Sequence, residues 1–281
     1  MTNNTANNSA HTTANTSSAA VAPVEPTIAS AFADRKALIG FLTAGDPNLA
    51  TTRDIVLGMA ESGCDLIELG IPFSDPVAEG PVIQEASLRA LANGITMDQI
   101  FDMVAEVREK SNVPLVFMGY MNPLLRYGME KFFARCAELG IAGIILADIS
   151  HEESHEVRDV ADKYGVAFIS MLAPTSTKRV SLIAPGSKGF IYLVSSLGVT
   201  GVRSEIKTNA AKIVEQVREY TDTPVAIGFG ISTPEQAHDM AEVADGAIIG
   251  SAIMEIVAEH GENAVEPVKQ YIAELRAGLD Q

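Results

Sequence analysis

Two hydrophobic periods alternate along this chain. Short runs of β-branched and aliphatic residues, apolar at nearly every position, are separated by longer segments in which apolar residues recur every three or four positions. The short runs indicate strands buried on both faces, and the longer segments indicate helices with one apolar face. We predict strands at residues 38–43, 66–69, 113–118, 141–147, 167–172, 190–194, 224–227 and 246–249. The predicted helices cover residues 28–35, 51–62, 83–91, 97–109, 129–139, 152–164, 177–184, 209–220, 233–241, 253–259 and 265–277.

The order of these elements predicts the fold. Counting from the first strand gives about eight β–α units, the number that closes a parallel barrel. We therefore predict an α/β protein, a (β/α)8 TIM barrel. A doubly wound open sheet is the alternative, but it needs a glycine-rich fingerprint after the first strand, and the Gly-Asp-Pro sequence at residues 45–47 is not one.

The beginning of the chain differs in composition from the rest. Residues 1–24 contain no Asp, Glu, Lys or Arg and consist mostly of Asn, Thr, Ser and Ala. A tract of this kind cannot bury enough apolar surface to order itself. We therefore predict two regions, a disordered tail at residues 1–27 and one barrel domain at residues 28–281.

The amino-acid composition limits which partners the protein can bind and in which cell compartment it can work. The formal net charge of −16 argues against nucleic acid and anionic membranes as partners. No apolar run approaches the length of a membrane span, and no secretory signal is visible at the N-terminus. The two cysteines, Cys64 and Cys136, lack metal-ligand spacing, so we expect both to be reduced and buried. These features predict a cytoplasmic protein.

One predicted strand carries a carboxylate among apolar residues. Glu68 lies between Ile67 and Leu69, where a buried charge is costly unless it is paired. A structural role is one interpretation, with backbone donors or an arginine holding the carboxylate. Catalysis is the other, because burial raises a carboxyl pKa toward the range that a general acid or base needs near neutrality.

A second carboxylate, Asp75, follows in a turn-rich loop that ends near Pro81, where we expect a helix to begin. Between Ser74 and Pro76, Asp75 also fits an Asx-turn without a functional role. However, Glu68 and Asp75 both lie at or after the carboxyl end of one strand. In a parallel barrel both would point into the same mouth, so we take them as the candidate catalytic pair.

The last two predicted β–α loops are rich in glycine. Residues 228–230 (Gly-Phe-Gly) precede one helix, and residues 250–251 (Gly-Ser) precede another. Such loops of a barrel often bind phosphate, because glycine lets backbone N–H groups approach the oxygens beside a helix N-terminus. Neither loop holds Lys or Arg, so binding would depend on neutral donors; simple tight turns are the alternative. A third loop, residues 198–201, is placed to fold over a bound ligand.

Residues 151–155 match the H-E-x-x-H zinc pattern. A true site places both histidines within a helix and adds a third ligand further on. Here the segment follows Ser150, a good N-cap, and neither His238 nor His260 has the spacing of a third ligand. We therefore expect no metal in this chain.

Together these motifs identify a family. Residues 66–84, LIELGIPFSDPVAEGPVIQ, resemble the signature of the tryptophan synthase α subunit, and the similarity extends over residues 28–278. Ordered matches elsewhere include residues 45–47, 118–120, 122–123, 173–176, 189–192, 198–201, 228–231 and 250–251. The resemblance implies a barrel that cleaves indole-3-glycerol phosphate into indole and glyceraldehyde 3-phosphate, for tryptophan biosynthesis.

The resemblance also implies roles for individual residues. Glu68 matches the family's catalytic Glu and would carry protons between the glycerol hydroxyl and indole C3. Asp75 matches the catalytic Asp and would accept the indole N–H, which stabilises the charge that develops on the ring. The implied substrate contacts are Phe41 near the ring, Tyr192 in a supporting position and, for phosphate, Gly201, Phe229, Gly230, Gly250 and Ser251.

A partner is implied as well. Family members form α2β2 complexes with a β subunit that carries pyridoxal phosphate, so we expect no cofactor in this chain. The chain departs from the common family pattern in three places: Glu79 stands in place of Asp, residues 147–150 read Ala-Asp-Ile-Ser in place of Pro-Asp-Leu-Pro, and Ser196 stands in place of Arg. In the family, the loop that holds Asp75 is part of the contact with the β subunit. The catalytic residues alone therefore do not predict how strongly this chain binds a β subunit.

Three alternatives remain open at this point. Another phosphate-binding barrel, such as a sugar-phosphate isomerase, would share the glycine loops but lack selectivity for an indole ring. A free-standing indole-3-glycerol phosphate lyase would release indole without a partner. A non-catalytic barrel that only activates a β subunit should have lost the Glu68 or the Asp75 carboxylate, and this chain keeps both.

Overall fold

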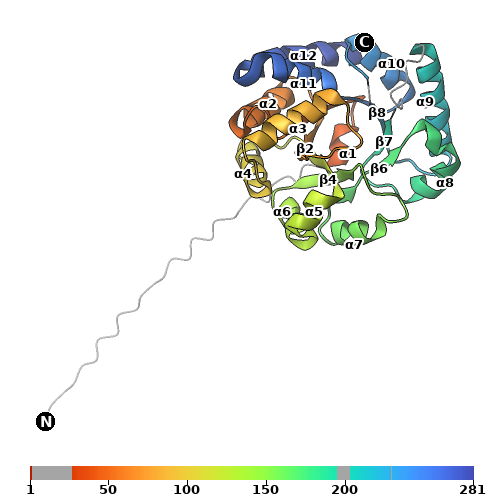
Figure 1. Cartoon of the computed structure of the whole chain (residues 1–281). Coiled ribbons are helices and arrows are strands. Elements are labelled where there is room, and N and C mark those ends of the chain that lie inside the picture. The colour runs from red at the N-terminus through yellow and green to blue at the C-terminus, as the bar shows by residue number, and fades with distance from the viewer. Residues whose placement is uncertain (2–26, 195–202, 229) are drawn as a thin grey trace.

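The strands form one parallel sheet that runs around a ring (Figure 1). The structure, a computed structural model, describes residue 1 and residues 27–194, 203–228 and 230–281, without the side chains of Pro174 and of residues 203–206. The predicted tail thus lies almost entirely outside the described residues. The strands are β1 (Ala37–Thr43), β2 (Leu66–Gly70), β3 (Leu115–Gly119), β4 (Ile141–Leu146), β5 (Ala167–Phe168), β6 (Ser170–Leu172), β7 (Ile191–Val194), β8 (Val225–Gly228) and β9 (Gly246–Ile249).

The ring closes through a single extended segment. The strand order is β5-β4-β3-β2-β1-β9-β8-β7-β6, and all neighbours pair in parallel. The two ends of this order, β5 and β6, flank Ile169, whose N–H donates to the carbonyl oxygen of Ile144 at 2.9 Å. When these two pieces are counted as one strand, the sheet is the eight-stranded barrel of the predicted (β/α)8 fold.

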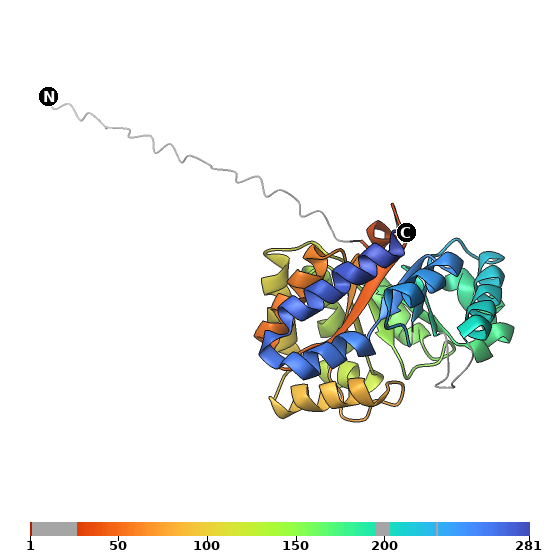
Figure 2. The ribbon, with the colours of Figure 1, turned by 90° about the horizontal axis from the view of Figure 1, so that it is seen from above.

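Helices form an outer ring around the strands (Figures 1 and 2). The helices are α1 (Ile28–Ala31), α2 (Leu49–Glu61), α3 (Pro81–Ala92), α4 (Met97–Arg108), α5 (Met121–Tyr127), α6 (Met129–Glu138), α7 (His155–Lys163), α8 (Val180–Ile183), α9 (Arg203–Arg218), α10 (Pro234–Val243), α11 (Ser251–His260) and α12 (Val265–Leu279). Short 3-10 helices are η1 (Pro174–Arg179), η2 (Ala184–Gly186) and η3 (Gly261–Asn263). We did not predict α5, a short helix whose Pro123 lies in its first turn, where the missing N–H is tolerated.

Side chains of each strand alternate between two cores. On β2, Ile67 and Leu69 point outward into the core between the sheet and the helices, whereas Leu66 points into the barrel. The period of two places Glu68 on the same inward row as Leu66. The strand sequence thus explains why this carboxylate faces the inside of the barrel.

Helix α1 covers the N-terminal mouth of the barrel. Ile28 and Ala31 are buried within the inner core. A Cβ added to Gly189, just before β7, would lie 2.7 Å from Cδ1 of Ile28. The apolar side chain therefore packs directly against the backbone at this end, and the opposite mouth is left for a ligand.

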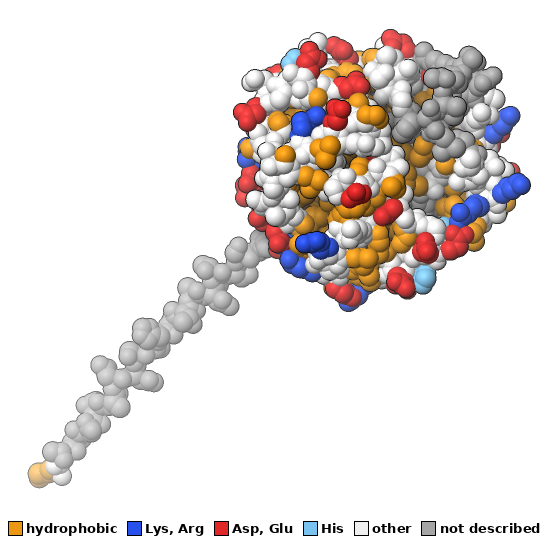
Figure 3. Space-filling model, in the orientation of Figure 1, with side chains coloured by type: hydrophobic (Ala, Val, Ile, Leu, Met, Phe, Trp, Pro, Cys, Tyr) orange, Lys and Arg blue, Asp and Glu red, His pale blue; other side chains and the backbone are white. Residues whose placement is uncertain are grey.

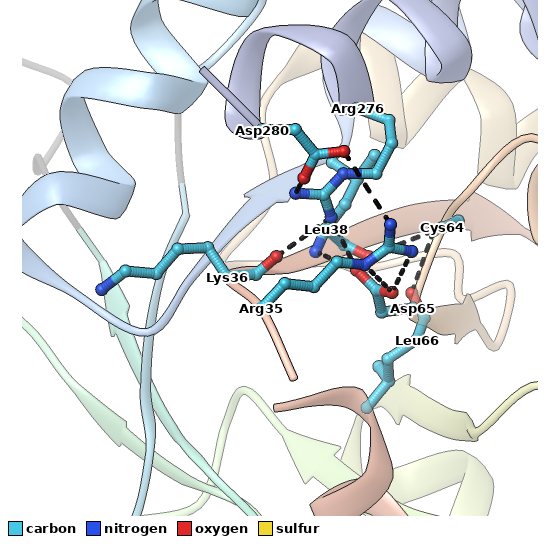
Figure 4. Close-up of polar contacts among 8 residues, drawn as sticks. All are labelled: Arg35, Lys36, Leu38, Cys64, Asp65, Leu66, Arg276 and Asp280. Carbon is cyan, nitrogen blue, oxygen red and sulfur yellow. Dashed lines mark hydrogen bonds and ion pairs between the residues drawn. The ribbon is translucent and has the colours of Figure 1, made fainter. Parts of the chain in front are cut away.

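A network of charged side chains ties the C-terminal helix to the same end of the barrel (Figure 4). The carboxylate of Asp65 accepts from Leu38 N–H at 2.8 Å, from Arg35 Nη2 at 2.8 Å and from Arg276 Nη1 at 2.9 Å. Arg276 also donates to Asp280 at 2.6 Å. These contacts join β1, β2 and α12, three elements that are distant in the sequence.

The surface agrees with the acidic composition. Figure 3 shows many Asp and Glu side chains around the edge of the face seen in Figure 1, and a few of them nearer its centre among apolar side chains. Among the described residues, no helix combines the length and the apolar character that crossing a membrane requires. Cys64 and Cys136 are both free and buried, as predicted.

Candidate active site

Glu68 lies in the middle of β2, inside the barrel. In the strand register its Cα is paired with that of Phe41 on β1 and with that of Val116 on β3. Its side chain is fully buried. A carboxylate thus occupies a position of the inner row that an aliphatic side chain would normally fill.

The Glu68 carboxylate has no protein partner in the described chain. Neither Oε1 nor Oε2 accepts or donates a hydrogen bond there. Burial raises the pKa of Glu68 from 4.5 to about 8. The group is therefore largely protonated at neutral pH and can donate a proton as readily as it can accept one.

Glu68 opens into a cavity of about 350 Å³ at the C-terminal mouth of the barrel, which we call the Glu68 cavity. Its lining combines apolar side chains, glycines and three carboxylates. The lining residues are Phe41, Glu68, Ala78, Glu79, Gly80, Ile83, Met118, Tyr192, Gly230, Ile231, Ser232, Ile248, Gly250, Ser251, Ala252 and Glu255.

The second carboxylate at this cavity is Glu79, in the loop between β2 and α3. Its Oε2 accepts a hydrogen bond from the Tyr120 hydroxyl, which itself accepts from Ala78 N–H at 3.0 Å. Burial, together with the nearby Asp148, raises the pKa of Glu79 to about 7. Tyr120 thus fixes the loop and its carboxylate over the mouth of the barrel.

Asp75, by contrast, does not line the Glu68 cavity. Its side chain is exposed, and its Oδ2 accepts from Ser74 Oγ at 2.5 Å. The structure therefore brings together Glu68 and Glu79, not Glu68 and Asp75 as the sequence predicted. The sequence held one indication of this arrangement, namely that Glu79 replaces an Asp of the family pattern. We noted that replacement only as a difference from the family and not as a candidate site residue.

Phe41 and Tyr192, the two predicted ring contacts, both line the cavity. Both rings lie against glycines, since a Cβ at Gly70 would be 2.5 Å from Phe41 Cζ and a Cβ at Gly228 would be 2.4 Å from Tyr192 Oη. Burial raises the pKa of Tyr192 well above its usual value, and the Glu68 and Glu79 carboxylates raise it further. Each ring of the cavity wall therefore depends on a glycine in the strand next to its own, Gly70 for Phe41 and Gly228 for Tyr192.

The predicted phosphate-binding residues fall into two groups. Gly230, Gly250 and Ser251 line the cavity, and α11 begins at Ser251. Gly230 has a φ of 76°, a backbone conformation that favours glycine. Gly201 and Phe229 lie outside the described residues. No Lys, Arg or His of the described chain lines this cavity, so neutral donors are what the described lining offers an anion.

The zinc-like pattern at residues 151–155 is not a helical metal site. Helix α7 begins at His155, so His151 lies in the preceding turn and the two histidines do not share a helix face. The Nδ1 atom of His155 lies 3.0 Å from the carbonyl oxygen of Glu152. Within the described residues, no group of three or more His, Cys, Asp or Glu could hold a metal ion.

Comparison with known proteins agrees with the geometry. The sequence model of one family, described as "Tryptophan synthase alpha chain", matches residues 29–280. This chain belongs to the tryptophan synthase alpha chain family. The family's α chain of Lactiplantibacillus plantarum is 48% identical over 250 residues, which cover 89% of this chain and 94% of that one. The α chain of Caldanaerobacter subterraneus is 48% identical over 248 residues, or 87% of this chain and 94% of that one.

Solved structures of the family share the fold. The tryptophan synthase alpha chain of Legionella pneumophila superposes with a TM-score of 0.80 at 36% identity, covering 88% of this chain and 92% of that one. A chain from a structure of the Pyrococcus furiosus tryptophan synthase α2β2 complex gives 0.80 at 37% identity, covering 86% and 98%. The predicted barrel and the predicted enzyme class, a lyase acting on indole-3-glycerol phosphate in tryptophan biosynthesis, are both confirmed.

Proposed function

We propose that Glu68 is the proton-transfer group of this lyase. Support comes from one observation above the others, a fully buried carboxylate at the mouth of the barrel whose oxygens have no partner in the described chain. A structural carboxylate would be held by backbone donors or by an arginine. Glu68 instead faces a cavity of the size that a small ligand needs.

In the reaction that we propose, Glu68 alone carries out both proton transfers. Protonated Glu68 gives its proton to indole C3, and the ring becomes a cation. The resulting carboxylate then removes the proton of the hydroxyl on the carbon attached to C3. That carbon becomes the aldehyde of glyceraldehyde 3-phosphate as the carbon–carbon bond breaks, and the bonding electrons return to the ring. Glu68 ends protonated and indole is released.

For the second carboxylate we propose Glu79 in place of Asp75. A carboxylate that accepts the indole N–H stabilises the cation, provided that it is ionised and points at the ring. Glu79 lines the cavity and is held by Tyr120, whereas Asp75 is exposed and bonded to Ser74. The assignment of Asp75 from the family resemblance stays a prediction that competes with this one.

Substrate binding is proposed to divide the cavity into two ends. The ring would pack among apolar side chains, with Phe41 and Tyr192 at the walls. The phosphate would accept hydrogen bonds at Gly230, Gly250 and Ser251, near the start of α11. Gly201 and Phe229 complete this cradle only by resemblance to the family.

The partner is proposed to be a tryptophan synthase β subunit in an α2β2 complex. Support comes from the similar chain of Pyrococcus furiosus, which was solved in a study of the tryptophan synthase α2β2 complex. Pyridoxal phosphate is assigned to the β subunit, because the cleavage described above needs only carboxylates from this chain. A cytoplasmic location accords with the family and with the reduced cysteines.

Indole release from indole-3-glycerol phosphate, measured with and without a β subunit, tests the function. Slow release alone and faster release with the partner are expected, whereas release that is fast alone would indicate a free-standing lyase. No release in either case would contradict the proposal.

Two variants of the same loop test the assignment of the second carboxylate. Glu79→Gln and Asp75→Asn each remove one charge and change little in size. We expect kcat/KM to fall by about 10² for Glu79→Gln, because a stabilising group is lost at the developing charge. Asp75→Asn should stay within about tenfold of the unmodified enzyme, less than loss of such a group costs. The reverse order would return the role to Asp75.

A further inference from the structure

A second cavity, which we call the Arg158 pocket, lies among the carboxyl ends of β4 and β6, helix α7 and the turn η1. It encloses about 230 Å³, and a water occupies about 30 Å³ in the liquid. Its polar lining includes Arg158, Arg179 and His151 with the hydroxyls of Ser170 and Ser176, and no Asp or Glu of the described chain lines it. The Glu68 cavity is the reverse, with three glutamates and no cation in its described lining.

The central group of the Arg158 pocket is the guanidinium of Arg158, which makes few and weak contacts with the described residues. Its carbon Cζ lies 5.0 Å from the centre of the Phe168 ring. Nη2 lies 3.3 Å both from Ser170 Oγ and from His151 Nδ1, which are long contacts to neutral groups. Nε is buried and has no hydrogen-bond partner among the described residues. Burial lowers the pKa of Arg158, and the carboxylate of Asp162 opposes this shift only in part, without an ion pair to Arg158 among the described residues.

Two other arginines show how this chain usually treats such groups. Arg179, on the rim of the same pocket, is neutralised by Glu152 at 2.5 Å. Arg108, at the other end of the barrel, donates to four backbone carbonyl oxygens. Arg158 is half-buried and has neither arrangement in the described chain, and its buried Nε is a donor without an acceptor there. An anion in the pocket would supply that acceptor.

Neutral donors stand beside the guanidinium. Ser170 Oγ accepts from Arg158, and Ser176 Oγ accepts from Ala173 N–H at 3.2 Å. Each hydroxyl therefore keeps its own hydrogen to donate. Ser170 is buried, so its donor faces the pocket and not bulk water. Together with Nε of Arg158 these groups form a set of donors without a matching acceptor.

We propose that the Arg158 pocket binds a small oxyanion, the phosphate or carboxylate group of a small molecule. The guanidinium supplies the charged hydrogen bonds, and the hydroxyls of Ser170 and Ser176 supply neutral ones. The site is distinct from the Glu68 cavity. The two share strand β7, which gives Tyr192 to one and Val194 to the other, but they share no lining residue. The proposal does not depend on the function proposed above.

The test is a titration of the full chain with inorganic phosphate and, separately, with acetate, followed by backbone amide NMR. We expect saturable shifts at the Ser170 and Ser176 amides with at least one anion, and the two titrations show which oxyanion is preferred. Arg158→Met keeps an unbranched apolar stem against Phe168 and should weaken that binding at least tenfold. The control Arg53→Met loses the same charge from a surface pair with Asp54 and Glu106 and should leave the affinity unchanged.

Several results would overturn the proposal. Anion-dependent shifts that are confined to Gly250 and Ser251 would place the anion in the Glu68 cavity alone. Shifts at Ser170 that appear with a β subunit but with neither anion would assign the pocket to a protein partner. Should Arg158→Met fail to fold, Arg158→Lys and Ser170→Ala replace it, and unchanged affinity in both would equally reject an oxyanion site.

Discussion

Two acidic side chains that are three positions apart in the sequence have opposite surroundings. Asp65, just before β2, accepts hydrogen bonds from Leu38, Arg35 and Arg276 (Figure 4). Glu68, within β2, has no hydrogen-bond partner in the described chain. Arg276, by contrast, has its charge neutralised by Asp65 and Asp280, although its Nε has no hydrogen-bond partner among the described residues.

The difference separates charges that build the fold from the charge that we propose performs chemistry. A paired carboxylate contributes to stability as long as its partners stay. A buried carboxylate without partners becomes protonated near neutral pH and costs stability when it ionises. The chain accepts that cost at Glu68, where we propose that a proton is transferred, and avoids it at Asp65, where a helix is attached.

The largest expected effect is on catalysis by Glu68→Gln. The amide keeps the shape of the side chain but cannot carry a proton, so we expect kcat to fall by roughly 10²–10⁴. Indole release at saturating substrate with a β subunit measures it. Turnover within about tenfold of the unmodified enzyme would mean that another group transfers the proton.

The same variant should gain stability. Between pH 4.5 and about 8 the unfolded chain has lost the Glu68 proton and the folded chain has kept it, so the free energy of unfolding falls as pH rises through this window. Removing the carboxyl should therefore stabilise the fold by up to roughly 3 kcal/mol at pH 7. Urea unfolding at pH 5 and at pH 8 measures the difference, which should be larger at pH 8.

Asp65→Asn is the matched change at the other end of the barrel, and it should give the opposite pattern. It removes one of the two carboxylates that neutralise the buried Arg276, so we expect a loss of roughly 1.5–3 kcal/mol in the free energy of unfolding, the scale of a hydrogen bond to a charged group. The kcat of the folded variant should stay close to that of the unmodified enzyme. If Asp65→Asn lost activity without losing stability, Asp65 would not have the purely structural role that distinguishes it from Glu68.

The smallest expected effect concerns Glu255, an exposed carboxylate that lines the phosphate end of the Glu68 cavity. Its charge opposes a phosphate, so Glu255→Gln should lower KM by up to about fivefold, the scale of exposed charge pairs. The effect should shrink at high salt. Glu259→Gln, on the same helix but outside the lining, is the control. If KM fell equally in both variants, the effect would come from the net charge of the protein and not from the position of Glu255.

Much of this architecture could be predicted because burial repeats along the chain. The apolar runs and the amphipathic segments gave the alternation of strands and helices, and Glu68 stood out because a carboxylate interrupted a buried strand. The glycines near residues 230 and 250 were found by their order in the barrel. Each of these signals is local in the sequence, and each has a direct physical cause.

The second carboxylate could not be chosen by the same means. Asp75 and Glu79 lie in one loop, and spacing alone does not say which of them turns inward. The choice depends on Tyr120, far along the chain, whose hydroxyl holds both Ala78 and Glu79. The sequence did not predict the Arg158 pocket for a similar reason. Arg158, Ser170 and Ser176 come together only when α7, β6 and η1 pack against one another.

The most direct test is a titration of the Glu68 carboxyl itself. Infrared difference spectra between the unmodified protein and Glu68→Gln isolate the carboxyl band of this residue across pH. We predict that the protonated band persists at neutral pH and disappears with a midpoint near 8, because burial without a partner raises the pKa. A midpoint near 4.5 would show a solvated or paired carboxylate and would contradict the account.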